Sequence, residues 1–160
     1  MGATGESRSM VGTLVAFATL TTMVIFGVAV AIAHEQSTTS FLGSGNKWCG
    51  FGQTAIQPPQ GAAAVYSYQP ACDALKKKDP GNLRTKTNLL KRNNGVFGQC
   101  RTGFWLYNTS RTSSTATLTT WGSSSSPPCG SGRYKVQGFQ GIKVSGNWKG
   151  GTVRSPGHDW

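Results

Sequence analysis

The last residues of the chain contain the three side-chain types of a hydrolase triad. Ser155, His158 and Asp159 lie close together in the stretch RSPGHDW. A working triad needs a nucleophile within hydrogen-bond reach of a base that an acid orients. Consecutive residues such as His158 and Asp159 point to opposite faces of a strand, and chain ends are usually the least ordered part of a domain. We therefore expect a polar terminus, docked through Trp160, rather than a catalytic site.

The sequence has too few suitable residues for other kinds of catalysis. Asp73 and Asp79 lie among lysines, where helix capping or solvated ion pairing explains them. A glycosidase needs two converging carboxylates, and metal-assisted hydrolysis needs three ligands, which two histidines and scattered acids supply poorly. The sequence has no glycine-rich phosphate-binding motif. We predict a non-enzymatic protein with no cofactor and no metal site.

Residues 10–33 form an uncharged apolar run close to the N-terminus. The run is long enough to span a bilayer as a helix. It ends in Ala31-Ile32-Ala33, whose small residues fit signal-peptidase cleavage before His34. Two alternatives follow: residues 1–33 are a cleaved signal peptide, or they are retained as a single-span membrane anchor. Both predict that the rest of the protein is extracellular or lies at the cell surface.

The four cysteines all lie beyond this apolar run, at Cys49, Cys72, Cys100 and Cys129. An even number in a small exported domain predicts two disulfides. A zinc site usually has closely spaced pairs such as C-x-x-C, which this sequence lacks. Three connectivities are open, and we favour Cys49–Cys72 with Cys100–Cys129 because each joins neighbours in the sequence. Each bridge would contribute roughly 3–4 kcal/mol by constraining the unfolded chain.

The remaining organisation is a polar linker at 34–46 followed by a disulfide-stabilised domain at 47–160. The linker assignment rests on small polar residues without a sustained period. Within the domain, Asp73 could cap a short helix that ends at Pro80-Gly81. Leucines at 83, 89 and 90 suggest a second helical piece that closes at Asn93-Asn94-Gly95.

The sequence beyond Gly95 has the alternation of β-strands. In TGFWLYN, Trp105 and Tyr107 point away from Phe104 and Leu106. Further strands are expected at 134–139, 142–145 and 148–153, with glycine-containing turns between them. We predict a mainly β fold, a small antiparallel sandwich or barrel with a short helical or loop segment, behind an N-terminal hydrophobic helix. We assign three large aromatic residues to its core: Trp48, Phe104 and Trp121.

The chain is strongly basic, with 16 Lys and Arg against 5 Asp and Glu and a formal net charge of +11. This balance attracts anionic partners, among them wall polymers, acidic glycans, lipid headgroups and nucleic acid, without choosing among them. The alternative is that the positive charge serves only to keep the protein soluble. A further alternative is that the protein contacts a membrane through residues 10–33.

Basic and aromatic residues interleave along the domain, a combination that stacks on sugar rings or bases and pairs with phosphates or carboxylates. Asn108-Thr109-Ser110 also matches a glycosylation sequon, which matters only in a eukaryotic secretory route. The candidate binding surface comprises Lys76, Lys77, Lys78, Arg101, Trp105, Tyr107, Arg111, Arg133, Tyr134 and Lys149.

Three functions remain in order of preference. The first is a secreted or anchored cationic module that binds anionic cell-envelope polymers or surfaces. The second is a bacteriocin-like toxin, which should carry an amphipathic helix with one basic and one apolar face. The best helix of that kind, residues 82–92, has only three leucines, so the first function is preferred. An exported hydrolase is the third.

Overall fold

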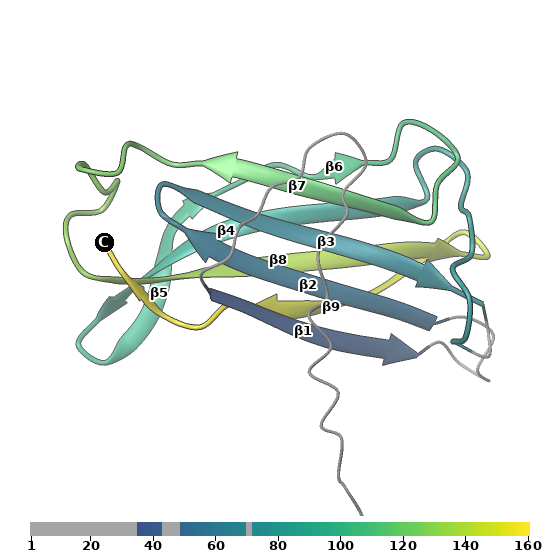
Figure 1. The fold of residues 1–160 in the computed structure, drawn as a ribbon, viewed down its shortest axis with the longest axis horizontal. Helices are drawn as coiled ribbons and strands as arrows, with labels where there is room; N and C mark the ends of the chain where they lie inside the picture. The colour runs from purple at the N-terminus through teal and green to yellow at the C-terminus, as the bar shows by residue number, and fades with distance from the viewer. Residues whose placement is uncertain (1–34, 43–48, 70–71) are drawn as a thin grey trace, which may run out of the picture.

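Two antiparallel β-sheets lie face to face in the computed structural model, which describes residues 35–42, 49–69 and 72–160 (Figure 1). The first sheet has the strand order β1-β2-β3-β7. The second has the order β10-β8-β4-β5, with β6 also paired to β4 and β9 also paired to β8. The strands are β1 (Glu35–Leu42), β2 (Cys49–Gln57), β3 (Gln60–Tyr68), β4 (Leu83–Asn93), β5 (Val96–Thr102), β6 (Leu106–Tyr107), β7 (Ser114–Thr120), β8 (Arg133–Val144), β9 (Asn147–Arg154) and β10 (His158–Asp159). The prediction of an all-β antiparallel fold is confirmed for these residues.

The predicted helical pieces between 73 and 93 are wrong. Residues 83–93 form β4, and the segment before it has only isolated bridges, at Leu75 and Lys78. Asn94 and Gly95, where the sequence predicts the end of a helix, have φ angles of 48° and 85°. Positive φ at both central residues is the geometry of a two-residue hairpin turn, so Asn94-Gly95 joins β4 to β5.

The leucines of β4 are spaced like those of a helix because other residues occupy some of the inward positions of this strand. Two threonines, Thr85 and Thr87, occupy inward positions between the leucines. Their hydroxyls hydrogen bond to Thr117 and Thr119 of β7 at 2.5 and 2.6 Å. The contact between β4 and the edge strand β7 is therefore polar, and the run of inward apolar residues on β4 is interrupted.

The apolar core lies on either side of this threonine layer. Trp121 is 7% exposed, as predicted, whereas Phe104 is 91% exposed and the prediction that it is buried is wrong. Trp48 lies outside the described residues. One cluster contains Ile56, Leu89, Trp121, Tyr134 and Val136, and the other contains Val65, Leu83 and Ile142.

At the N-terminus, the residues that the structure describes begin at residue 35. Residues 35–42, interpreted from the sequence as part of a flexible linker, form strand β1 and pair with β2 along its whole length. The apolar run at 10–33 and the cleavage point before His34 lie outside the described residues. In the described part of the chain, no helix is long and apolar enough to cross a membrane.

Both disulfides have the predicted connectivity. Cys49 bonds Cys72 with Cα atoms 5.6 Å apart, and Cys100 bonds Cys129 with Cα atoms 6.1 Å apart. The first ties the start of β2 to the segment after β3, and the second ties β5 to the segment between β7 and β8. Two such bridges are consistent with an oxidising extracellular environment.

Candidate functional site

The guanidinium of Arg84 is stacked between two tryptophan rings on the outer face of the second sheet. Its Cζ lies 4.2 Å from the ring centroid of Trp105 and 4.0 Å from that of Trp148. Trp105 precedes β6, which pairs with β4, and Trp148 lies on β9, which pairs with β8. Three segments that are distant in the sequence therefore meet at one cation.

Strand alternation places Arg84 on this outer face. Its neighbour Thr85 is buried and bonded to the first sheet, so Arg84 projects the other way. The residue opposite Arg84 on β8 is Gly141. A Cβ at that position would lie 3.0 Å from Nε of Arg84 and 3.2 Å from the ring of Trp148. Glycine at 141 thus leaves room for the guanidinium to lie against the sheet.

The donors of Arg84 are unused within the described part of the chain. Its Nε is buried without a hydrogen-bond partner, and no ion pair to the side chain is formed there. A guanidinium offers a planar fork of N–H donors that matches carboxylate and phosphate oxygens. Each ring contributes roughly 0.5–2 kcal/mol through cation–π attraction, which holds the fork in place. The arrangement can therefore present a fixed cation to an anionic ligand.

Further aromatic rings extend the site. Tyr107 packs on Trp148 with ring centroids 5.9 Å apart, and Trp105 packs on Phe139 at 6.3 Å. Trp105 and Tyr107 are 37% and 41% exposed. Beside them lies a shallow hollow of about 280 Å³. It is lined by Arg84, Trp105, Phe139, Gln140, Gly141, Trp148, Lys149, Gly150, Gly151 and Thr152.

The charge of this face is one-sided. Two described carboxylates are already paired elsewhere: Asp79 with Arg111 at 3.4 Å, and Asp159 with Arg133 at 2.9 Å at the β10 end of the sheet. Besides Arg92 and Arg133 near the other end of the sheet, the cations at outward positions of β4, β8 and β9 are Arg84, Lys86, Lys135, Lys143 and Arg154. We call these five cations, together with Trp105, Tyr107, Phe139 and Trp148, the aromatic–cationic face.

The structure divides the predicted binding surface into three groups. Trp105, Tyr107 and Lys149 lie at the aromatic–cationic face or its hollow. A second group lies around the connection between β3 and β4 and comprises Lys76, Lys77, Lys78 and Arg111. The third group lies near the C-terminus and comprises Arg101, Arg133 and Tyr134.

The third group has structural contacts. Tyr134 is 0% exposed, which removes it from any binding surface. Its hydroxyl donates to the carbonyl of Gly130. Arg101 donates to the carbonyl of Pro128 at 3.1 Å, and Arg133 donates to Asp159 and to the carbonyl of Gly157 at 2.9 Å. These side chains hold the loops and the chain end in place.

Sequence reasoning missed Arg84, Lys86, Phe139 and Lys143 as site residues. The signal that could have found them is the strict alternation of Arg84 and Lys86 with threonines, which indicates a strand with one cationic face. That signal was lost because the segment was interpreted as a helix. The stacking of Arg84 between two rings has no local signature, since it depends on how β4, β6 and β9 are placed.

The C-terminal residues do not assemble the triad. The hydroxyl of Ser155 is buried, accepts a hydrogen bond from the amide of Val136 at 2.9 Å and donates to the carbonyl of Pro156 at 2.9 Å. Asp159 pairs with Arg133, and β10 sets it next to His158 on a strand, where the two side chains point to opposite faces. A hydroxyl held in this way is poorly placed to act as a nucleophile.

Asn108 of the glycosylation sequon has a structural role. It is 5% exposed, and its Oδ1 accepts a hydrogen bond from the amide of Leu83 at 2.8 Å. Its Nδ2 donates to the carbonyls of Asp79 and Ser110 at 2.9 and 2.8 Å. The nitrogen that would carry a glycan is therefore enclosed in this fold.

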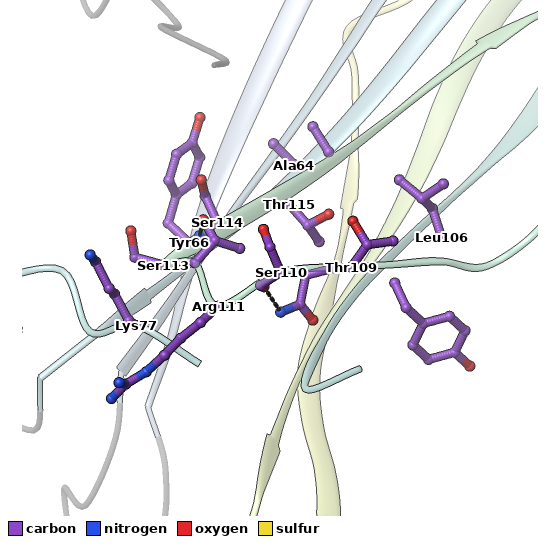
Figure 2. Close-up of a pocket in the computed structure, with 14 residues that line it drawn as sticks. Ala64, Tyr66, Lys77, Leu106, Thr109, Ser110, Arg111, Ser113, Ser114 and Thr115 are labelled. Carbon is purple, nitrogen blue, oxygen red and sulfur yellow. Dashed lines mark hydrogen bonds between the residues drawn. The ribbon is translucent and has the colours of Figure 1, made fainter. Parts of the chain in front are cut away.

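A larger open groove, with a volume of about 710 Å³, lies beside the connection between β6 and β7, and Figure 2 draws the residues that line it. Lys77 and Arg111 lie at one end of it, away from Leu106. Much of its remaining lining consists of hydroxyl side chains: Tyr66, Thr109, Ser110, Thr112, Ser113, Ser114 and Thr115. Burial raises the pKa of the Tyr66 hydroxyl, with a smaller contribution from Tyr68, so this hydroxyl stays neutral and can donate a hydrogen bond.

No family model matches this chain, and searches of curated proteins and of solved structures give no match either.

Proposed function

We propose that this protein is a non-enzymatic cationic module of the cell exterior that binds an anionic polymer through the aromatic–cationic face. The observation that carries the proposal is Arg84, whose guanidinium is fixed between Trp105 and Trp148 and forms no ion pair with any described residue. A positioned guanidinium loses less entropy on binding than a free one.

The neighbouring groups suit a polymer better than a small ligand. The hollow at Arg84 is shallow, and cations continue along the sheet on both sides of it. Lys86 lies next along β4, and Lys135 and Lys143 lie towards opposite ends of β8. A chain of repeating anionic groups could touch several of these cations at once, while the rings stack on its sugars or bases.

Two further features support a binding role over the alternatives. In the segment 82–92, the best candidate for the amphipathic helix of a membrane-active toxin, residues 83–92 lie in strand β4 instead. Ser155 is engaged by backbone groups, which weakens the case for a hydrolase at the chain end. Export and localisation at the cell surface fit the two disulfides, and the apolar run at 10–33 would supply the signal or the anchor.

The test is retention of the full-length protein on immobilised heparin, a polyglycerol phosphate wall polymer, single-stranded DNA and anionic liposomes across a salt series. Retention should fall steeply with salt, because the Debye length is about 8 Å at physiological ionic strength. Arg84→Gln should elute at clearly lower salt than the unchanged protein. Trp105→Ala should lower mainly the retention that persists at high salt, since stacking is not screened.

Arg92→Gln is the matched control, because it removes the same charge from the same strand about 26 Å further along β4. It should change elution less than Arg84→Gln. If the protein ignores every polyanion at low salt, the proposal fails and the charge serves solubility. If Arg92→Gln and Arg84→Gln act equally, net charge rather than the aromatic–cationic face is responsible.

A further inference from the structure

A basic pocket lies at the end of the sandwich where three connections meet. Residues 72–82 before β4, the segment between β6 and β7 and the turn between β8 and β9 all lie at the same end, on the right in Figure 1. The pocket between them has a volume of about 380 Å³. Its lining comprises Lys76, Lys77, Lys78, Asp79, Asn82, Arg111, Lys143, Ser145 and Gly146.

The charges in this pocket are unbalanced. Five cations face one carboxylate, Asp79, and that carboxylate is already paired with Arg111 at 3.4 Å. The four lysines form no ion pair with any residue in the described ranges. Burial lowers the pKa of Lys78, and the positive charge of Lys76 lowers it further. An anion placed here would relieve this repulsion.

The backbone that carries these cations is held in place. Lys78 and Thr112 exchange two backbone hydrogen bonds of 2.7 and 3.0 Å, which join two of the three connections. The amide of Lys143 donates to the carbonyl of Asn82 at 2.8 Å, and this bond joins the β8 end to the same place. Asn108 donates to the carbonyl of Asp79 at 2.9 Å. The backbone positions of these cations are therefore fixed before binding, and only their side chains must be ordered when an anion binds.

We propose that this basic pocket binds a compact dianion, namely a phosphate or sulfate group. Lysine ammonium groups act as strongly hydrated point charges that pair with phosphate oxygens, and Ser145 and Asn82 can add neutral hydrogen bonds. The pocket is larger than a single tetrahedral anion requires, so it can also hold a group esterified to the anion. This inference does not rest on the proposed function: the two sites share Lys143, but the pocket's other cations, Lys76, Lys77, Lys78 and Arg111, lie outside the aromatic–cationic face.

The experiment is an NMR titration of the full-length, ¹⁵N-labelled protein in a non-ionic detergent. One arm uses inorganic phosphate and the other glycerol 3-phosphate, each against potassium chloride of equal ionic strength. Both phosphates should shift the amides of Asn82, Ser145 and Gly146 saturably, while chloride should not. Lys143→Gln and Lys78→Gln should each weaken phosphate binding on the order of tenfold, the effect of losing one charge-assisted contact.

Lys135→Gln is the matched control, since it removes the same charge from the same strand, about 26 Å from Lys143. It should leave phosphate binding within about twofold of the unchanged protein. Arg84→Gln should do the same, which separates this pocket from the proposed polymer site. Binding of both phosphates identifies an esterified group as a ligand, and binding of inorganic phosphate alone identifies the free ion. No saturable shift, an equal effect of chloride, or an equal loss in Lys135→Gln would overturn the proposal.

Discussion

The indole of Trp160 packs against the ring of Tyr134, with 5.2 Å between the ring centroids. The indole nitrogen donates to the carbonyls of Ser123 and Ser124 at 3.2 and 3.1 Å. The backbone of Trp160 also exchanges two hydrogen bonds, of 2.7 and 2.9 Å, with Gly132. The last residue of the chain therefore closes one end of the larger apolar cluster, and the polar residues before it are held in β10 as a consequence.

Replacing this last side chain tests that role. Trp160→Ala should lower the free energy of unfolding by about 2–4 kcal/mol, because it removes a large ring packed on a buried tyrosine and a hydrogen-bond donor. Trp105→Ala, which removes an indole that is 37% exposed, should cost markedly less. Urea unfolding followed by circular dichroism measures both. Equal losses would mean that the chain end contributes no more than a surface ring.

Ser155 gives a second test, which separates a structural hydroxyl from a catalytic one. Ser155→Ala should destabilise the protein by about 1–3 kcal/mol, because the amide of Val136 loses its buried acceptor. His158→Ala should leave any hydrolytic activity of the preparation unchanged. Melting temperatures and a panel of chromogenic ester and glycoside substrates provide the readouts. A loss of activity by orders of magnitude in both variants, with unaltered melting, would restore the triad.

Asn108 is predicted to be indispensable to the connection between β6 and β7. Asn108→Ala removes the acceptor for the amide of Leu83 and the donor to the carbonyls of Asp79 and Ser110, and should cost at least about 2 kcal/mol. Asn147→Ala, beside the exposed turn between β8 and β9, should lower the free energy of unfolding by only about a few tenths of a kcal/mol. Thermal unfolding of the two variants compares them. A stable, normally melting Asn108→Ala would show that these bonds do not fix the loop.

What the sequence could predict follows from how local each signal is. The disulfide pairing was predictable because the cysteines that are neighbours in the sequence are also the bonded pairs. The strands beyond Gly95 were largely predictable because their alternation is local, although β8 runs without a break through Gln140-Gly141, where a turn was expected. Sequence alone cannot tell a turn glycine from one that makes room for Arg84 on a neighbouring strand.

The face on which a strand is buried was harder to read. In β7 the alternation of Ala116 and Leu118 with threonines is real, yet the threonines point inward and Leu118 is 45% exposed. Hydrophobicity predicts the opposite. The threonines can be inside because each finds a hydroxyl partner on β4, and a partner on another sheet is not visible from one strand. Arg84 could not be predicted for the same reason, because its role depends on the rings of Trp105 and Trp148 in two other segments.

Reduction of the disulfides should destabilise the domain strongly. Each bridge closes a loop with a sequence separation of 23 or 29 residues, which corresponds to about 3–4 kcal/mol of unfolded-state constraint. Because total stability is about 5–15 kcal/mol, a reductant should lower the melting temperature by many degrees. Calorimetry with and without reductant measures this, and peptide mapping without reductant checks the pairing. A Cys49–Cys100 peptide, or an unchanged melting temperature, would contradict the prediction.

The buried hydroxyl of Tyr134 should make the protein sensitive to alkali. Burial raises the pKa of this hydroxyl, outweighing a backbone hydrogen bond at Cys129 and the charge of Arg101, which lower it. The folded protein therefore keeps this proton at a pH where the unfolded chain, with an ordinary pKa near 10, loses it. Stability from this group is complete below about pH 10 and is lost as the pH rises towards the folded pKa.

Tyr134→Phe isolates this effect. At neutral pH the variant should be less stable by about 1 kcal/mol, because the carbonyl of Gly130 loses its donor. Above pH 10 its stability should fall less steeply than that of the unchanged protein, since the phenylalanine ring has no proton to lose. Melting temperatures from pH 8 to pH 11 provide the comparison, with Tyr107→Phe at an exposed position as the control for losing a hydroxyl. Parallel profiles of Tyr134→Phe and the unchanged protein above pH 10 would show that alkaline unfolding begins elsewhere.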